Sequence, residues 1–168
     1  MCDWFGRILS RRMLKLTKKA DYGLIALKHL ATLPGGRSAS AKEIAESYHI
    51  PLPLLSKVLQ KLGREGFLQS EHGTNGGYRL ARYAREISTL EVIRSIDGPI
   101  ILTSCFTGHR ECDQSARCSV REPLRKVHEG ILRLLGSITI ADLAQDEMQD
   151  ICVSGISVDR PLPVVSNV

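Results

Sequence analysis

The chain has 168 residues, of which 43% are hydrophobic and 24% charged, a composition typical of globular proteins rather than disordered or fibrous ones. No apolar run approaches the ~20 residues that span a bilayer, and the N-terminal residues lack the apolar core of a signal peptide, so we expect a cytoplasmic protein without a membrane partner. The net charge of +5 is divided unevenly: residues 11–82 hold thirteen Lys and Arg against five Asp and Glu, and residues 83–168 hold nine against twelve. This division is typical of a nucleic-acid-binding module joined to a sensing or dimerising element, the alternative being an uneven scatter of solvated side chains.

Three helices are predicted in the basic half. Residues 1–12 show no helical period that continues into the next residues, so we treat them as an N-terminal extension. The first helix is apolar on more than one side, which predicts that it is covered by several neighbours. The second opens on a Ser-x-x-Glu capping box, and the third opens on a proline, which is tolerated in the first turn because the amide there has no helical partner. The predicted helices span residues 17–33, 40–48 and 53–65.

The third helix has one apolar and one polar face. Its apolar face repeats at helical spacing and consists of Leu55, Val58, Leu59 and Leu62. The polar face combines short polar with long basic side chains, which together can reach base edges and phosphates. A solvated surface face is the alternative. The residues that we expect to contact DNA from this helix are Pro53, Ser56, Lys57, Gln60, Lys61 and Arg64.

Two strands, predicted at residues 67–72 and 78–82, flank a turn rich in Gly and Asn, which tolerate positive φ. Three helices followed by such a hairpin is the order of a winged helix-turn-helix domain, here residues 13–86, whose third helix enters the major groove. The hairpin can then lie against the phosphates or in the minor groove. The remaining expected DNA contacts are Thr17 and Lys18 at the start of the first helix, and His72, Gly73, Thr74, Asn75 and Arg79 on the hairpin.

The second half is predicted to hold a short helix at residues 88–97, a long helix from Val120 and a further short helix at residues 139–144. The apolar residues of the long helix, from Val120 to Ile138, repeat at alternating spacings of four and three, which favours packing on a partner helix in a dimer over packing within its own domain. A second capping box at Ser119–Glu122 is expected to open this helix. The fold class is therefore mainly α with a small β-hairpin, a winged helix-turn-helix plus a long dimerisation helix. Residues 87–148 hold a cysteine loop and this helix, and residues 149–168 form a disordered tail.

Three of the five cysteines, Cys105, Cys112 and Cys118, lie in a polar loop with almost no apolar residues. Thiolates are soft ligands that select zinc, copper(I) or an iron–sulfur cluster, whereas buried structural cysteines usually have apolar surroundings. Zinc sites favour closer cysteine pairs, so an iron–sulfur cluster, either 2Fe–2S or 4Fe–4S, is the preferred interpretation, with a fourth ligand from elsewhere. Zinc, a disulfide with one spare cysteine, and cysteines without a role stay open as alternatives.

Four stretches together resemble the bacterial iron–sulfur winged-helix transcription regulators of the IscR and NsrR type, most closely those of the SUF cluster-assembly system. They are Leu16 to Tyr22, the helix from Ile50 to Phe67 with its leading prolines, the hairpin turn from Gly73 to Tyr78, and the cysteine loop. The resemblance covers about residues 13–145. It implies a homodimer that binds an imperfect palindrome in a promoter, with a cluster that tunes this binding.

The chain departs from the family pattern at two points. The first cysteine gap is six residues where several relatives have five, and Arg121 stands where IscR-type proteins have a histidine three residues after the third cysteine. The fourth cluster ligand must then come from another position. Some NsrR-type members use an acidic residue in the first helix, which corresponds to Asp21 here. The candidates within the loop itself are His109, Glu111 and Asp113.

We therefore predict a sequence-specific DNA-binding transcription regulator, a homodimer on double-stranded promoter DNA, that controls iron–sulfur cluster assembly genes. The alternatives with the same fold are a nitric-oxide or redox-sensing repressor and a regulator with a structural zinc. An enzyme that uses Cys112 with His109 or His128 is the rival from another class. No substrate-pocket motif or base-orienting arrangement supports it, so we expect no catalytic residue and no small-molecule substrate.

Overall fold

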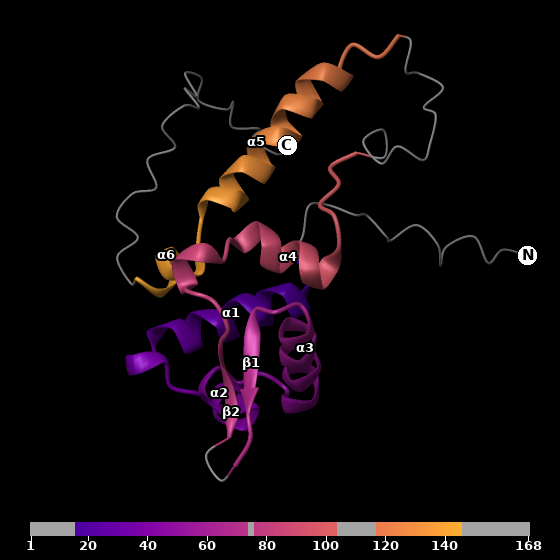
Figure 1. The fold of residues 1–168 in the computed structure, drawn as a ribbon. Helices are drawn as coiled ribbons and strands as arrows, with labels where there is room; N and C mark the ends of the chain where they lie inside the picture. The colour runs from indigo at the N-terminus through magenta and orange to yellow at the C-terminus, as the bar shows by residue number, and fades with distance from the viewer. Residues whose placement is uncertain (1–15, 74–75, 104–116, 146–168) are drawn as a thin grey trace, which may run out of the picture.

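A computed structural model of the chain describes residues 16–73, 76–103 and 117–145 (Figure 1). The predicted fold class, mainly α with a small hairpin in a winged helix-turn-helix arrangement, is confirmed. The predicted helices and strands all form within about two residues of their expected bounds. In chain order they are α1 (Lys18–Thr32), α2 (Ala41–Ser47), α3 (Leu52–Arg64), β1 (Leu68–Glu71), β2 (Gly77–Leu80), α4 (Thr89–Asp97), α5 (Arg121–Ser137) and α6 (Ile140–Ala144).

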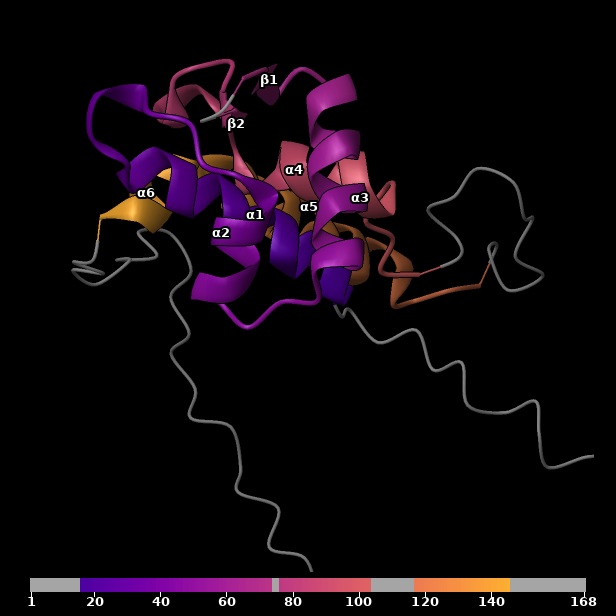
Figure 2. The same ribbon diagram turned by 90° about the horizontal axis from the view of Figure 1, so that it is seen from below.

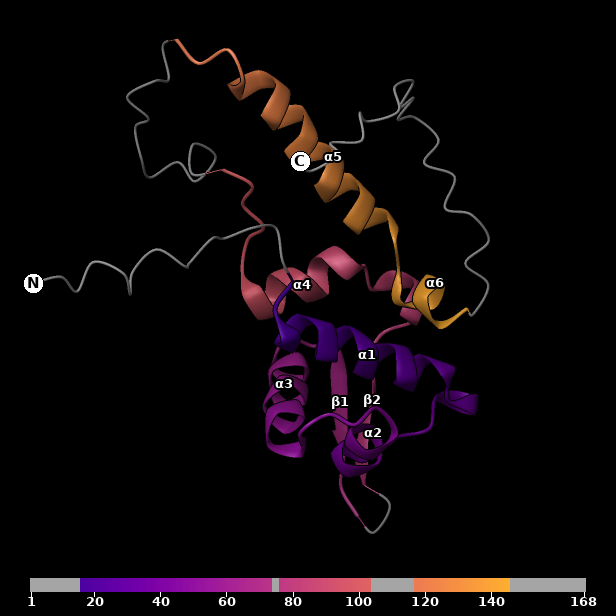
Figure 3. The same cartoon turned by 180° about the vertical axis from the view of Figure 1, so that it is seen from behind.

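Helix α1 lies in the middle of the molecule, with α2, α3 and the hairpin on one side and α4 and α6 on the other (Figure 3). This position explains why α1 is apolar on more than one side, as predicted, because Leu27 and Leu30 are buried within the core. The same core receives Leu55, Leu59 and Leu62 from α3, together with Ile93 from α4 and Ile140 from α6. Each such side chain stabilises the fold by about 1.5–3 kcal/mol through burial alone. The elements on both sides of α1 therefore form one folded body.

The hairpin is antiparallel and is extended on its outer edge by a contact that no local sequence pattern predicts. Leu68 pairs with Leu80 and Ser70 pairs with Tyr78 across the two strands. The amide of Ala39 donates to the Tyr78 carbonyl oxygen at 3.0 Å, and the Tyr78 amide donates to the Ala39 carbonyl oxygen at 2.8 Å. The chain before α2 thus fixes the hairpin to the helices. Gly77 makes this close approach feasible, since a Cβ there would lie 2.4 Å from the Ala39 oxygen.

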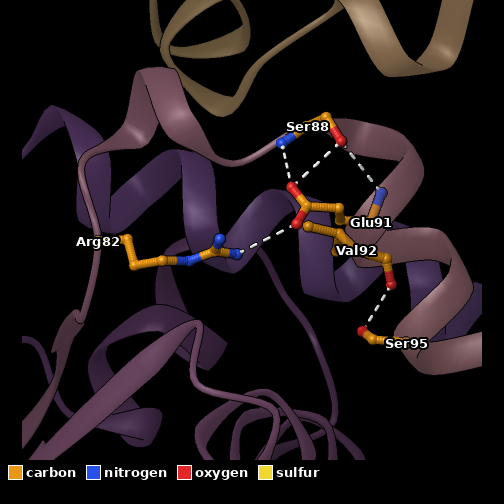
Figure 4. A network of polar contacts seen from close by, with 5 residues as sticks. All are labelled: Arg82, Ser88, Glu91, Val92 and Ser95. Carbon is orange, nitrogen blue, oxygen red and sulfur yellow. Dashed lines mark hydrogen bonds and ion pairs between the residues drawn. The ribbon is translucent and has the colours of Figure 1, made fainter. Parts of the chain in front are cut away.

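Side-chain caps begin most of the helices. Thr17, Ser40, Ser88 and Thr139 each accept a hydrogen bond from a backbone amide in the first turn of the helix that they precede. At Ser88 the box is complete, because Glu91 accepts from the Ser88 amide at 3.1 Å and also pairs with Arg82 at 3.5 Å (Figure 4). The hairpin end is thereby joined to the start of α4.

The predicted capping box at Ser119–Glu122 is wrong. Helix α5 begins at Arg121 after Val120, which has no side chain that can cap. The physical reason is the register of the helix: with Val120 at the cap position, Glu122 is the second helical residue, whereas a box needs it at the third. Glu122 instead accepts from Arg125 Nε at 2.9 Å. At the other end, Ile138 follows the last helical residue, Ser137, so both predicted end positions of the apolar stripe lie one residue outside the helix.

Helix α5 has no fully buried residue along its 17 positions and extends away from the other helices in Figure 1. Its C-terminal end packs on α4, where the Thr89 hydroxyl donates to the Leu135 carbonyl oxygen at 2.5 Å. Val120, just before the helix, and Val127 and Leu134 within it are 55%, 52% and 39% exposed. The apolar stripe of α5 is therefore only partly covered within the described part of the chain. Among the described residues, no helix is long and apolar enough to span a membrane.

Candidate nucleic-acid interface

A tight turn between α2 and α3 sets the direction of the third helix. His49 has φ 52°, a left-handed conformation that residues other than glycine rarely adopt. Directly after it, the Ile50 amide donates to the Ala45 carbonyl oxygen at 2.9 Å, and the Ile50 side chain is buried. Pro51 and Leu52 then open α3, one residue earlier than the predicted start at Pro53. The turn thus holds one face of α3 on the core and leaves the opposite face exposed.

The exposed face of α3 carries five of the six DNA-binding residues that were predicted on this helix. Pro53, Lys57, Gln60 and Arg64 are exposed and Ser56 is half-buried. Within the described part of the chain, Lys57, Gln60 and Arg64 make no hydrogen bond or ion pair through their side chains. Short and long donors on one unpaired face are suited to contact both bases and phosphates.

Lys61 differs from the other predicted residues of α3. It is half-buried, and its Nζ donates to the carbonyl oxygen of Ile96 at 3.1 Å, at the C-terminal end of α4. The Lys61 ammonium is therefore engaged within the protein. No sequence pattern indicates this contact, because residues 61 and 96 are far apart along the chain.

The hairpin presents two different faces. Gln69, Glu71 and Arg79 share the outer face and pair with one another: Arg79 Nε lies 2.7 Å from Glu71 Oε1, and Arg79 Nη2 donates to Gln69 Oε1 at 2.9 Å. His72 and Gly73 are exposed where the strands end, and Gly73 has φ 125°. The predicted contacts Thr74 and Asn75 lie outside the described residues. Arg79 can contact DNA only by sharing or leaving its two partners.

The inner face of the hairpin turns toward α3, and the two elements enclose an open groove of about 470 Å³. Sequence reasoning did not single out its strand residues. The alternation of side chains along a strand could have indicated these residues, because every second residue of a strand, such as Leu68 and Ser70, lies on the same face. The groove is lined by Gln60, Gly63, Arg64, Leu68, Ser70 and Tyr78.

The start of α1 is attached to the end of α4. The Thr17 hydroxyl donates to Asp97 Oδ1 at 2.6 Å, and the Thr17 amide donates to Asp97 Oδ2 at 3.2 Å. Thr17 also caps α1, since its hydroxyl oxygen accepts from the Ala20 amide at 3.3 Å. Lys18, another predicted phosphate contact, is exposed beside it. Asp97 was not identified from the sequence, where it is only the last residue of a predicted helix.

Two of the predicted cluster ligands, Cys105 and Cys112, lie outside the described residues. Cys118 is half-buried, precedes α5 by three residues and forms no disulfide with a described residue. Asp21 is exposed in the first turn of α1, and its carboxylate has no side-chain partner among the residues that the structure describes. No three His, Cys, Asp or Glu residues of the described ranges lie close enough together to hold a metal.

The donors that are described are chemically suited to a cluster. Cys118 is a thiol without a disulfide partner there, and an unpaired carboxylate at Asp21 can accept a cation. Asp21 lies one turn after Thr17, which contacts Asp97, and residues 98–103 lead from Asp97 toward the cysteine loop. The first turn of α1 therefore adjoins the segment that leads into the loop.

Comparison with known proteins identifies the family. The Rrf2 family model, described as "Iron-dependent Transcriptional regulator", matches residues 16–146. The HTH-type transcriptional regulator NsrR of Geobacillus kaustophilus is 34% identical over 134 residues, which cover 79% of this chain and 91% of that protein.

Solved structures with the same fold include two named regulators. CymR, the global cysteine regulator of B. subtilis, matches with a TM-score of 0.68 and 29% identity, over 79% of this chain and 97% of that chain. IscR of T. potens matches with a TM-score of 0.62 and 32% identity, over 79% of this chain and 88% of that chain. These relatives are regulators and not enzymes, and the predicted resemblance is confirmed. The chain belongs to the Rrf2 family of iron-dependent transcriptional regulators.

Proposed function

We propose that the chain binds an inverted repeat in promoter DNA as a homodimer and that an iron–sulfur cluster tunes this binding. The observation that carries the proposal is the face of α3, on which Lys57, Gln60 and Arg64 are exposed and unpaired within the described chain. Membership of the Rrf2 family supports it. In this proposal the target genes are those of iron–sulfur cluster assembly, and the protein works in the bacterial cytoplasm, where its promoter lies.

The proposed division of roles follows the sequence. Residues 13–86 read DNA, residues 87–148 hold the cluster and the dimer contact, and residues 1–12 and 149–168 flank them. This is a division of roles and not of folding, because Ile93 and Ile140 are buried in the same core as Leu27. A change near the cluster therefore acts on a body that includes the DNA-reading helices.

A second copy of the chain is the proposed occupant of the α5 stripe. Val127 and Leu134 lie on one side of a helix with no fully buried residue, and both are substantially exposed. Apolar residues at spacings of three and four are typical of a helix that packs along another helix. A two-fold dimer would present two copies of α3, as an inverted repeat requires.

The proposed cluster ligands are Cys105, Cys112, Cys118 and Asp21, the last from either subunit. When bound, the cluster supplies a centre whose loss or oxidation changes the contacts of its ligands. Two contacts connect the end of α4, from which the chain continues toward the cysteine loop, to the DNA-reading helices. Asp97 binds Thr17 at the start of α1, and Lys61 of α3 binds the carbonyl oxygen of Ile96 next to Asp97. These contacts support a route from the cysteine loop to the DNA-reading helix.

Two measurements test the proposal. Protein purified without oxygen is expected to be brown, to absorb broadly between about 320 and 450 nm and to contain iron and acid-labile sulfide, as thiolate-bound clusters do. The same protein is expected to select from random sequences an inverted repeat with half-sites about 34–36 Å apart. Colourless protein with stoichiometric zinc would support the structural-zinc alternative instead, and colourless protein without metal would direct attention to thiol-based regulation.

A nitric-oxide or redox-sensing repressor of the same fold is the second candidate. An oxygen ligand such as the Asp21 carboxylate binds iron less tightly than a thiolate, which leaves one iron open to small molecules. Nitric oxide added to the anaerobic protein would then abolish operator binding, whereas the cluster-assembly regulator responds to the supply of cluster itself. Binding isotherms of apo, cluster-bound and nitric-oxide-treated protein on one operator separate the two.

A further inference from the structure

The groove between α3 and the hairpin has polar groups on both walls. Arg64 and Gln60 reach it from α3, and Ser70 and Tyr78 reach it from the strands as a directly opposed pair. Figure 2 shows α3 beside β1 of the hairpin, and residues of both elements line the groove. A single water needs only about 10–15 Å³ of such space, so about 470 Å³ admits a much larger group.

The two faces of the hairpin differ in how their polar groups are satisfied. On the outer face, Arg79 is paired with Glu71 and Gln69. On the groove face, the hydroxyls of Ser70 and Tyr78 have no hydrogen-bond partner among the described residues, and neither does the Arg64 guanidinium across the groove. No carboxylate lines the groove among the residues that the structure describes. One free cation and two free hydroxyls that face a common space, as far as the described chain extends, form a donor set for an anion.

Gly63 adds a steric observation. It lies in the last turn of α3 on the groove wall, where an alanine would favour the helix more than glycine does. A Cβ at this position would meet nothing closer than the Leu68 carbonyl oxygen at 3.9 Å, so the folded protein itself has room for one. The missing side chain instead keeps the groove open for a ligand that approaches the backbone of α3.

The geometry of DNA identifies the ligand. The sugar–phosphate backbone is the ridge that separates the major from the minor groove, so a protein with a helix in one and a hairpin at the other must straddle that ridge. The space between helix and hairpin then faces a phosphodiester. We propose that this groove binds a backbone phosphate of the operator, with Arg64 as the cation and the hydroxyls of Ser70 and Tyr78 as donors to the phosphate oxygens.

This inference rests on the proposed DNA binding and deepens it by assigning two residues, Ser70 and Tyr78, to positioning. Hydroxyl and arginine contacts to phosphate fix the register of a protein on the duplex without reading sequence. A clamp at the junction of α3 and the hairpin would fix both elements at once. Lys57, nearer the start of α3, is then held in a defined place over the base edges.

The test compares Tyr78→Phe, Ser70→Ala and Arg64→Gln on the selected operator and on a scrambled duplex over a range of salt concentrations. Each variant is expected to bind both duplexes about tenfold more weakly, because a hydrogen bond to a charged group is lost. Arg64→Gln is expected to reduce the slope of log affinity against log salt by about 0.9, since one phosphate contact loses its cation. Tyr78→Phe and Ser70→Ala leave that slope unchanged, because they remove no charge.

An operator series with single uncharged methylphosphonates locates the contact. One position in each half-site is expected to weaken the wild type, and the same substitution is expected to have little further effect in Arg64→Gln, as for two groups that contact each other. Gly63→Ala is expected to keep or raise the melting temperature while it weakens binding to both duplexes. These opposite effects separate a blocked groove from a damaged fold.

Arg94→Gln is the matched control, because it removes an exposed cation from α4, outside the groove. If the groove variants bind as the wild type does while Lys57→Ala weakens operator binding, the phosphate clamp is wrong and the DNA-binding proposal stands. If Arg64→Gln weakens the operator only, Arg64 reads a base and the clamp is also wrong. If the wild type binds no duplex at all, the proposed function itself fails.

Discussion

Lys57 and Lys61 lie one turn apart on α3, yet their side chains have different surroundings. Lys57 is exposed and unpaired within the described chain, whereas Lys61 is half-buried and donates to the Ile96 carbonyl oxygen. The sequence predicts that both enter the DNA groove. With these contacts in view, we propose that Lys57 reads a base and that Lys61 positions α3 against α4.

Substitution by alanine separates these two roles. Lys57→Ala is expected to cost about 1–3 kcal/mol of binding free energy on the best operator and much less on random DNA, because a base contact is lost. Lys61→Ala is expected to lower the free energy of unfolding by about 1 kcal/mol through its lost hydrogen bond, and to weaken both duplexes equally. Binding isotherms and urea unfolding measure the two effects. Arg94→Ala, which removes an exposed cation from α4, is the control. An equal loss of affinity on both duplexes for Lys57→Ala would show that Lys57 contacts only phosphate.

Asp142 makes the start of α6 sensitive to acid. The Thr139 amide and hydroxyl each donate to Asp142 Oδ2 at 2.7 Å, and these hydrogen bonds lower the pKa of the carboxyl below its ordinary value of 3.8. A group whose pKa is lower in the folded state stabilises the fold above its unfolded pKa and loses this effect as the pH falls through the folded value.

We therefore expect the wild type to be more stable than Asp142→Asn at neutral pH, and the difference to shrink as the pH falls below about 4. The free energy of unfolding from urea titrations at pH 3 to 7 measures it. Glu86→Gln, an exposed acid in the segment before α4, serves as the control for net charge. A difference between wild type and Asp142→Asn that does not change with pH would contradict the assigned cause.

At the scale of elements, α5 is the helix whose apolar residues are least covered by the described part of the chain. Its end packs on α4, but Val127 and Leu134 remain 52% and 39% exposed among the described residues. In the middle of this helix stands Gly130, whose Cβ would meet no described atom within 4 Å. A glycine costs helical stability but lets another helix come close. Both observations favour a helix-on-helix contact between two copies.

Val127→Glu is expected to raise the dissociation constant of the dimer tenfold or more, which corresponds to about 1.4 kcal/mol. The reason is that two-fold symmetry brings two new carboxylates into the contact at once. Sedimentation equilibrium of apo protein measures the constant. Lys126→Gln makes the same change of charge at the neighbouring exposed position and is expected to leave it unchanged. A Val127→Glu protein with the wild-type constant would exclude this face of α5 from the dimer.

The start of nearly every helix could be predicted, because a cap depends on adjacent residues such as Ser40 and Glu43. The prediction at Ser119–Glu122 failed because α5 begins one residue later than the box requires, with Val120 at the cap position. The pairing of Ala39 with Tyr78 could not be predicted in the same way, since it joins segments that no local pattern connects. The strand residues of the groove could be predicted only in part. The alternation of side chains shows which residues of one strand share a face, but Ser70 is matched with Tyr78 only once the register of the two strands is known.

At the scale of the whole molecule, the end of α4 is where the predicted sensing half meets the DNA-reading half. Asp97 binds Thr17 of the α1 cap and Ile96 binds Lys61 of α3, while the chain continues from there toward the cysteine loop. Sequence reasoning proposed Asp21 as a link between cluster and reader but did not find these contacts, because they depend on the packing of three helices.

Asp21→Ala is expected to shorten the lifetime of the cluster in air and to change its absorption spectrum, because one ligand is lost. Glu43→Ala is the matched control: both residues are exposed acids in the first turn of a helix, so both variants lose the same favourable interaction with the helix dipole, about 0.3–1 kcal/mol. Only Asp21→Ala should alter the cluster. An unchanged spectrum and lifetime would remove Asp21 from the site and leave His109 and Glu111 to be tested.

Gly23 lies where α1 packs against both α3 and the end of α4. It is buried in α1 where a Cβ would come within 2.5 Å of Ile96 Cδ1, 3.5 Å of Val58 Cγ1 and 3.7 Å of Leu62 Cδ1, atoms that belong to α4 and α3. A methyl group there would displace the end of the Ile96 side chain, while the atoms of α3 lie at ordinary van der Waals distance. The end of α4 also contacts α3 through the hydrogen bond from Lys61 to the Ile96 carbonyl oxygen, so the two helices share this packing. For protein engineering, Gly23→Ala would therefore alter the packing of α1 on the end of α4 from a buried position, away from the exposed face of α3.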